Sequence, residues 1–185
     1  CQQVFGGHGF IEEWGMSQFV RDCRIALIYE GANGIQALDL VGRKLGRNGG
    51  RALMTLNAEI DGFIAEHKGN EAIADYITAL EEAKGTLTQG TMWLMQNGMT
   101  NPDNAGAGSV DYMHMMGLTV FSYLWAQMAV VAQKAIDDGS NEDFYSNKLI
   151  TGRYFIARML PLTKSHLAKI KTGADPVMAL PVEAF

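Results

Sequence analysis

The stretch Tyr29-Glu30-Gly31-Ala32-Asn33-Gly34-Ile35-Gln36 decides how the first part of this 185-residue chain is organised. A glutamate stands between an aromatic residue and a glycine, just before a segment whose apolar residues recur at helical spacing. Glycine adopts backbone conformations that other residues avoid, so the stretch predicts a tight turn that presents the Glu30 carboxylate. A carboxylate held on a turn beside an apolar segment is a candidate catalytic base.

A second glycine-rich stretch lies upstream, Gln3-Val4-Phe5-Gly6-Gly7-His8-Gly9-Phe10. No side chain projects from a glycine Cα, so the backbone here can closely approach another chain or a cofactor. Between the two stretches, residues 13–28 carry apolar positions at helical spacing, which predicts a short amphipathic helix. Cys23 lies among these apolar positions and is expected to be a buried, small apolar residue.

Three short motifs together resemble a known family. Gln3-x-x-Gly6-Gly7-x-Gly9, Arg21-Asp22 and Ile28-Tyr29-Glu30-Gly31 occur in the order and spacing of the acyl-coenzyme A dehydrogenases. These flavoproteins oxidise an acyl thioester between its α and β carbons. The resemblance covers residues 1–45, and the sequence from Ile35 to Leu45 is similar to the subgroup that has an extra helical extension.

The resemblance implies two domains. Residues 1–48 would end the family's C-terminal helical domain and carry the base turn, and residues 49–185 would form the helical extension and tail. The chain begins at Cys1 without a methionine and directly in a family motif. We therefore expect an upstream portion that carries most of the flavin and acyl sites, and a chain that is inactive by itself.

The resemblance also implies residue roles. Glu30 would abstract the α proton, Tyr29 would shape the substrate pocket, and Gly31 would leave room for the thioester end of an acyl-CoA. The residues implied to lie against FAD are Gln3, Gly6, Gly7, Ala32 and Gly34. Ala32 stands where the family commonly has threonine, so positions 32 and 34 can offer the cofactor only backbone.

The rest of the chain is predicted to be mostly helical. Apolar residues recur at helical spacing over 34–45, 51–68, 70–97, 109–139 and 140–171, with Pro161 predicting a kink in the last. Glycine, asparagine and proline are frequent in residues 98–108, which predicts a loop, and the tail from Gly173 is expected to be extended. The predicted fold is all-α: a short N-terminal helical segment followed by an antiparallel four-helix bundle.

Composition narrows the possible partners. The net charge of −5 argues against a surface for nucleic acid, whose phosphates attract basic chains. Two cysteines are too few for a disulfide framework and fit the reducing cytoplasm. No uninterrupted apolar run suggests a membrane span, and the four histidines lack metal-ligand spacing, so no metal site is predicted.

Three functions follow as hypotheses. The first is the C-terminal part of an FAD-dependent acyl-CoA dehydrogenase, which would act as a homo-oligomer and pass electrons to an electron-transfer flavoprotein. The second is a catalytically silent association module formed by residues 51–185, which packs subunits or covers the substrate channel. The third is a family relative that binds nucleic acid, which the intact Tyr29-Glu30-Gly31 and the net charge disfavour.

Overall fold

The computed structural model describes residues 1–184, and it confirms the all-α prediction: no strand occurs in this part of the chain. The structure divides into two compact units, Cys1–Ala37 and the residues from Leu38 onward. Residues 38–48, which the sequence analysis grouped with the N-terminal segment, belong to the second compact unit. The expected domain boundary at residue 48 stays a prediction.

The first unit is built from short helices around one amphipathic helix. Its elements are η1 (Gln2–Phe10), η2 (Glu12–Trp14), α1 (Met16–Arg24), η3 (Ile25–Leu27) and the first residues of α2 (Asn33–Asp39). Helix α1 packs against η1, η2 and η3. The helix expected over residues 13–28 is therefore present, as α1 continued by η3.

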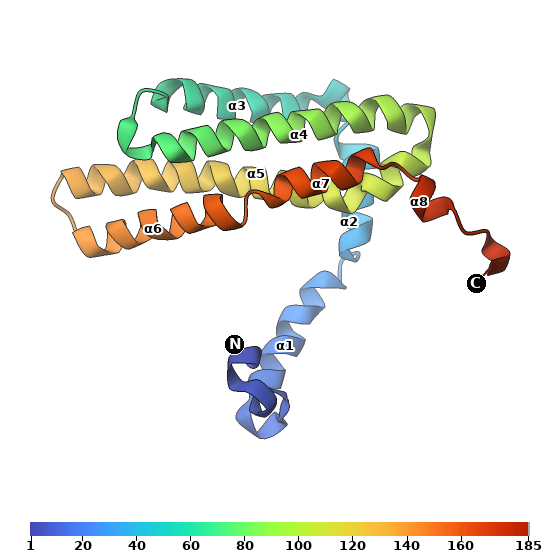
Figure 1. The fold of residues 1–185 in the computed structure, drawn as a ribbon, viewed down its shortest axis with the longest axis horizontal. Helices are drawn as coiled ribbons and strands as arrows, with labels where there is room; N and C mark the ends of the chain where they lie inside the picture. Colours follow the sequence, from blue (N-terminus) through green and yellow to red (C-terminus); the bar gives the residue numbers. More distant parts are fainter. Residues whose placement is uncertain (185) are drawn as a thin grey trace. The chain divides into compact units, whose positions relative to one another are not determined.

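The second unit consists of long helices that run alongside one another (Figure 1). Its elements are η4 (Leu40–Lys44), η5 (Arg47–Gly50), α3 (Arg51–His67), η6 (Glu71–Ile73), α4 (Ala74–Thr100), α5 (Pro102–Asp137), α6 (Glu142–Arg158), α7 (Leu162–Lys171), α8 (Asp175–Met178) and η7 (Val182–Ala184). Helix α4 packs on α3 and α5, and both α6 and α7 pack on α5. The finer expectation of a four-helix bundle stays a prediction.

Two apolar clusters form the core of the second unit. One is centred on Ile60, Tyr76 and Tyr123, and it joins α3, α4, α5 and α6. The other is centred on Leu87 and Ile170, and it joins α4, α5 and α7. Burial of large apolar side chains is the main stabilising term in folding, so these clusters hold the long helices together.

The loop predicted for residues 98–108 is wrong. Helix α4 continues to Thr100, only Asn101 intervenes, and α5 begins at Pro102. The Asn101 side chain accepts a hydrogen bond from the Asp103 N–H at 3.0 Å, and Pro102 occupies the first helical position, where its missing N–H costs nothing. The asparagine and proline are therefore a helix start, and the glycines lie within helices.

Near the C-terminus the break at Pro161 is confirmed, because α6 ends at Arg158 and α7 starts at Leu162. The expectation of an extended tail is wrong in part, since residues after Gly173 form the short α8 and then the 3-10 turn η7. Helix α5 meets the length and composition required to cross a membrane, although 39% of its most apolar window is buried within this chain. Core helices of water-soluble proteins meet the same criteria.

Candidate active site

The turn that carries Glu30 joins η3 to α2. Both Ile28 and Tyr29 donate their N–H groups to the Ile25 carbonyl, at 2.9 and 3.1 Å, which closes the end of η3. Glu30 then has φ +56° and Gly31 has φ +89°, so two consecutive residues adopt left-handed backbone geometry. This conformation suits glycine but is uncommon for a glutamate, so the turn holds Glu30 in a backbone geometry that its side chain disfavours.

Glu30 offers three functional groups. Its side chain is exposed and makes no hydrogen bond within the described residues. Its backbone N–H likewise has no partner in residues 1–184, whereas its carbonyl accepts a hydrogen bond of 2.7 Å from the Gln36 side-chain amide. A free carboxylate and a free N–H on one residue can serve together as a base and a donor to developing negative charge.

The two neighbours of Glu30 differ in the space around them. Tyr29 is 54% exposed and so presents an open aromatic face. Gly31 is constrained, since a Cβ there would lie 3.2 Å from the Gln36 Nε2 atom and 3.5 Å from Ile35 Cγ2. Neither residue alone encloses a substrate.

The residues expected to contact FAD upstream are Gln3, Gly6 and Gly7, all exposed on η1. Gly6 has φ +59° and ψ −139°, a conformation that is essentially restricted to glycine. Added Cβ atoms at Gly6 and Gly7 would meet nothing within 4 Å. The backbone there is therefore open to a ligand, as the resemblance requires.

The remaining cofactor candidates, Ala32 and Gly34, lie at the start of α2. The Ala32 carbonyl accepts from the N–H groups of Ile35 (2.8 Å) and Gln36 (3.1 Å), which begins the helix. Gly34 is exposed, and an added Cβ there would meet nothing within 4 Å. Together with η1, these residues fit a cofactor that lies along an exposed backbone edge, but they do not surround one.

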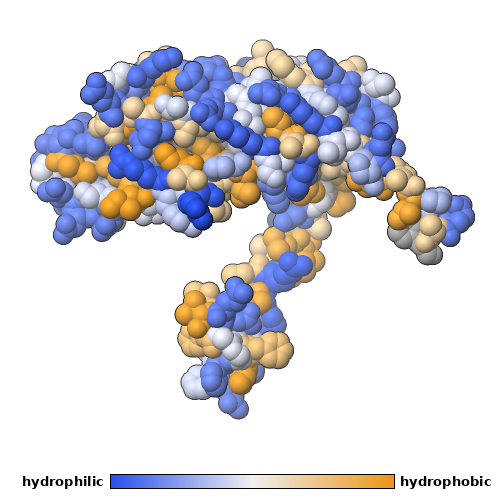
Figure 2. Space-filling model, in the orientation of Figure 1, coloured by the Kyte–Doolittle hydropathy of each residue, from blue (hydrophilic) through white to orange (hydrophobic). Residues whose placement is uncertain are grey.

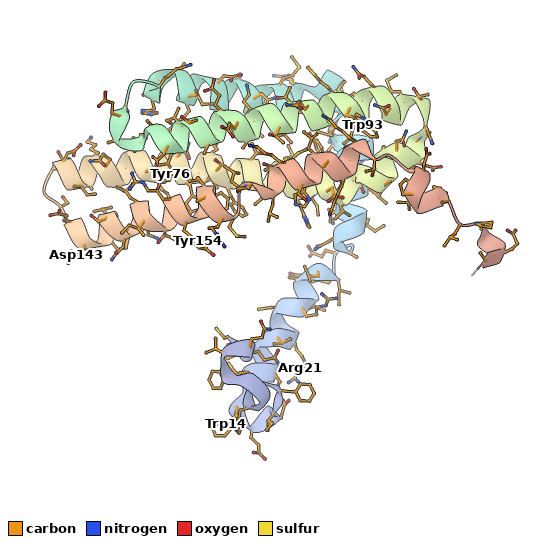
Figure 3. All side chains as sticks on the ribbon, viewed as in Figure 1. Trp14, Arg21, Tyr76, Trp93, Asp143 and Tyr154 are labelled. Carbon is orange, nitrogen blue, oxygen red and sulfur yellow. The ribbon has the colours of Figure 1, made fainter. Side chains whose placement is uncertain are left out.

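Helix α1 connects the two candidate groups. An ion pair of 2.9 Å between Arg21 Nη2 and Glu12 Oε1 ties it to η2, and Ser17 Oγ donates to Glu12 Oε2 at 2.7 Å (Arg21 is labelled in Figure 3). The hydrogen bond from Arg21, then that from Ser17, lowers the pKa of Glu12 to about 2. Arg21 of the family-like Arg21-Asp22 motif is thus part of a surface ion pair that orients the N-terminal segment.

Apolar side chains cover much of the first unit's surface, as Figure 2 shows. Phe10 is 84% exposed, Phe19 is 63% exposed and Ile28 is 56% exposed. The expectation that Cys23 is buried is wrong, since Cys23 is exposed on α1. In the first unit only Gly9 and Ala37 are buried. An apolar surface of this kind is typical of a face that packs against further protein.

The second unit contains an apolar cavity of about 800 Å³. It lies between η4, η5 and α3 on one side and α4 and the start of α5 on the other, with no charged residue in its lining. Four methionines contribute to the lining, and methionine adapts readily to different occupants. The lining residues with the longest apolar side chains are Leu38, Leu45, Leu53, Met54, Met92, Leu94, Met95 and Met99.

Histidines of the second unit take part in a polar cluster between α5 and α7. Asp111 Oδ1 lies 2.7 Å from His166 Nδ1 and 2.8 Å from Lys169 Nζ, and the His114 ring is exposed beside His166. Burial raises the pKa of Asp111, but the hydrogen bonds from Lys169 and His166 outweigh burial, so the net pKa is lowered. Among residues 1–184, no group of three or more His, Cys, Asp or Glu side chains is arranged to hold a metal ion.

Sequence reasoning identified Tyr29, Glu30 and Gly31 as one turn, and the structure brings them together with Gln36. The hydrogen bond from Gln36 was not predicted, although Gln36 lies in the same stretch of sequence as the turn. The sequence did offer a signal for this bond: a glutamine six positions after Glu30, in the first turn of the predicted helix. Glu12 was also missed, and its partner Arg21 was known only as part of a motif.

The chain matches two family models and several known proteins. Residues 56–181 match the family described as acetyl-CoA dehydrogenase C-terminal like, and residues 1–45 match the acyl-CoA dehydrogenase C-terminal domain. The chain is 32% identical to the broad-specificity linear acyl-CoA dehydrogenase FadE5 of Mycobacterium tuberculosis, over 99% of this chain and 31% of that protein. It is 33% identical to 3-methylmercaptopropionyl-CoA dehydrogenase of Ruegeria pomeroyi, over 95% of this chain and 30% of that protein.

A shorter match is 40% identical over 43 residues, covering 23% of this chain and 11% of the caffeyl-CoA reductase-Etf complex subunit CarC of Acetobacterium woodii. The chain thus spans 31% and 30% of the lengths of the two relatives that it matches almost throughout. The family matches at both ends of the chain, together with the all-α fold, place this protein in the acyl-CoA dehydrogenase family.

Proposed function

We propose that this chain contributes the catalytic base of an FAD-dependent α,β-dehydrogenation of an acyl-CoA thioester, and that the base is Glu30. The observation that carries the proposal is the turn itself. Glu30 is held in left-handed geometry, and neither its carboxylate nor its N–H has a hydrogen-bond partner in residues 1–184. Backbone strain of this kind clusters at functional sites, which supports a role for Glu30.

The chemistry assigned to Glu30 is removal of the α proton of the thioester. A carboxylate becomes a stronger base when water is excluded, because desolvation disfavours its charged form. The exposed apolar surface of the first unit supports the idea that further protein covers this turn. The free Glu30 N–H would donate to the thioester oxygen, where negative charge develops as the proton leaves.

FAD, when bound, would supply the acceptor for the hydride that leaves the β carbon, which no amino acid side chain accepts well. The chain's own contribution would be to position one edge of the cofactor. Gln3, Gly6 and Gly7 would contact it from η1, and Ala32 and Gly34 would do so from the start of α2. Tyr29 and Gly31 would border the acyl thioester.

The proposal extends to partners and location. The relative CarC is named as a subunit of an Etf complex, which supports an electron-transfer flavoprotein as the electron acceptor here. We also propose a homo-oligomer, because the apolar surface of the first unit suits a further protein contact. A cytoplasmic location fits the two free cysteines, Cys1 and Cys23.

The test is Glu30→Gln in the full-length enzyme that carries this chain. The substitution keeps the size of the side chain but removes the base, so turnover with a dye acceptor should fall by at least about 10²- to 10⁴-fold, while FAD stays bound. Glu13→Gln is the matched control, because Glu13 is also exposed in the first unit and should keep full activity. Retained turnover in Glu30→Gln would refute the assignment.

A second candidate function is a silent association module, and α5 gives it an observation of its own. Phe121, Leu124, Met128 and Val131 are spaced three or four residues apart on one face, and they are 56%, 42%, 40% and 62% exposed. If this stripe joins subunits, Leu124→Glu should lower the mass measured by analytical ultracentrifugation. Asn147→Glu on α6 is the control, and an unchanged mass in Leu124→Glu would remove the stripe from consideration.

A further inference from the structure

The side chain of Gln36 reaches back across the turn and binds the backbone of Glu30. Its Nε2 atom donates to the Glu30 carbonyl at 2.7 Å. A carbonyl oxygen can only accept a hydrogen bond, so the interaction requires an amide N–H at this place. The two partners are six positions apart in the sequence, so the bond closes a loop around the turn and is not a contact between neighbours.

Gln36 is itself anchored at the end of the loop. Its backbone N–H donates to the Ala32 carbonyl at 3.1 Å, and the Ile35 N–H donates to the same carbonyl at 2.8 Å. The first turn of α2 therefore fixes the Gln36 backbone, and the Gln36 side chain extends from it to the Glu30 carbonyl. The contact links the orientation of Glu30 directly to a helix.

A restraint is needed at this position because of the local geometry. Glu30 has φ +56° and is followed by Gly31 at φ +89°. Left-handed geometry is unfavourable for a residue with a side chain and persists only where the surroundings hold it. In the described residues, the bond from Gln36 is the hydrogen bond made to the Glu30 backbone, so it is the contact available to hold that geometry.

We propose that Gln36 is a positioning residue, which fixes the directions of the Glu30 carboxylate and N–H by holding the Glu30 carbonyl. The inference rests on the proposed function, in which Glu30 is the base. Gln36 touches neither substrate nor cofactor in this role. It acts on the reaction through the backbone of Glu30.

Gly31 is coupled to the same hydrogen bond. A Cβ at position 31 would lie 3.2 Å from Gln36 Nε2, tighter than an ordinary contact, so the amide would have to move away from the Glu30 carbonyl. Gly31→Ala should therefore weaken the hydrogen bond from Gln36 to the Glu30 carbonyl, which Gln36→Met removes altogether. The two substitutions share their effect on the bond between Gln36 and Glu30, so that part of their losses is expected to be non-additive. Gly31→Ala carries a further loss of its own, because alanine is strained at φ +89°.

The kinetic test compares Gln36→Met with wild type in the full-length enzyme. Methionine preserves length and lacks the donor. Butyryl-CoA, octanoyl-CoA and 3-methylmercaptopropionyl-CoA are the probes, each also deuterated at the α carbon. A misplaced base should lower kcat by roughly 10- to 100-fold with little change in KM, and should enlarge the isotope effect because proton removal becomes slower.

The controls separate positioning from folding. Flavin content and Tm should match wild type in Gln36→Met, since the hydrogen bond lies in an exposed turn. Gln133→Met is the matched substitution, because Gln133 also donates its amide, to Asp137 at 2.9 Å, in an exposed part of α5. It should leave kcat and the isotope effect unchanged. The Gly31→Ala, Gln36→Met double variant should lose less than the product of the two single losses.

A readout independent of activity is the Glu30 backbone angle, measured by NMR scalar couplings and chemical shifts in this 185-residue chain. Wild type should show a positive φ that Gln36→Met loses or averages. A wild-type rate and an unchanged positive φ in Gln36→Met would overturn the inference while leaving the base assignment intact. Turnover in Glu30→Gln would instead overturn the proposed function, and the NMR result would still decide whether Gln36 restrains the turn.

Discussion

Gly152 in α6 is the position at which one added methyl group tests how closely this helix packs. A Cβ there would lie 2.5 Å from the Tyr76 hydroxyl oxygen, 2.7 Å from Tyr76 Cε1 and 3.0 Å from Trp125 Cε3. Tyr76, labelled in Figure 3, is 1% exposed and donates its hydroxyl to the Leu149 carbonyl. We expect Gly152→Ala to destabilise the second unit, although alanine is the better helix former.

The magnitude follows from three contributions. Alanine in place of glycine in a helix interior stabilises by about 1 kcal/mol. Overpacking a closely packed site costs about 1 to 3 kcal/mol. If the Tyr76 ring shifts to make room, its buried hydroxyl loses its acceptor, at a cost of about 1 to 3 kcal/mol. A net loss near 3 kcal/mol lowers Tm by roughly 6 to 12 °C in a chain of this size.

The assay is thermal unfolding followed by far-UV circular dichroism, which is dominated by the long helices of the second unit. Gly85→Ala on α4 is the matched control, because Gly85 is exposed and an added Cβ there would meet nothing within 4 Å. It should raise Tm slightly. A similar rise in Gly152→Ala would show that α6 does not lie against Tyr76 as described, and the packing argument would fail.

Three further predictions concern polar contacts. Asn101→Ala removes the side-chain cap of α5 and should lower the free energy of unfolding by about 1 kcal/mol in chemical denaturation. The pKa of Glu12 is lowered to about 2, so its pairing with Arg21 stabilises the folded state above pH 4.5 and is lost as the pH falls toward 2. In Arg21→Gln, the Glu12 pKa measured by NMR should move back toward 4.5. The pKa of Asp111 is also lowered, so its contacts stabilise the folded state at neutral pH and weaken in acid. Asp111→Asn removes the ionic partner of Lys169 and should lower the free energy of unfolding at pH 7 by about 1 to 3 kcal/mol. Urea unfolding at several pH values should also show a smaller loss of stability in acid than in wild type.

The helices of the second unit could largely be predicted from sequence, because apolar spacing records which face is buried. Residues 98–108 were mispredicted for a specific reason. Glycine signals both a flexible loop and a close helix contact. A Cβ on Gly98 would lie 3.1 Å from Ala105 Cβ, and one on Gly108 would lie 3.2 Å from Leu94 Cδ2. These glycines thus let helices approach, and only the partner's position distinguishes the two uses.

The candidate site was predictable to a different degree. The Tyr29-Glu30-Gly31 turn could be located from sequence, because a glycine after a polar residue and before a helix indicates a reversal of the chain. The left-handed geometry of Glu30 could not, since that conformation is rare for glutamate. The side-chain bond from Gln36 to the Glu30 carbonyl could not be predicted either. The exposure of Cys23 also escaped prediction, because the apolar pattern of α1 shows an apolar face but not what covers it.

The strained turn and the well-packed second unit support one division of roles. A glycine at position 30 would adopt left-handed geometry freely, but it could not provide a carboxylate. A glutamate provides the carboxylate but must be held in this geometry, and the bond from Gln36 to the Glu30 carbonyl would do so in the proposed role. In the second unit, Asn48 (φ +51°) and Asn141 (φ +25°) also have positive φ, but asparagine adopts this region more readily than glutamate does. Left-handed geometry at an exposed glutamate is the pattern expected where a residue is kept for its chemistry.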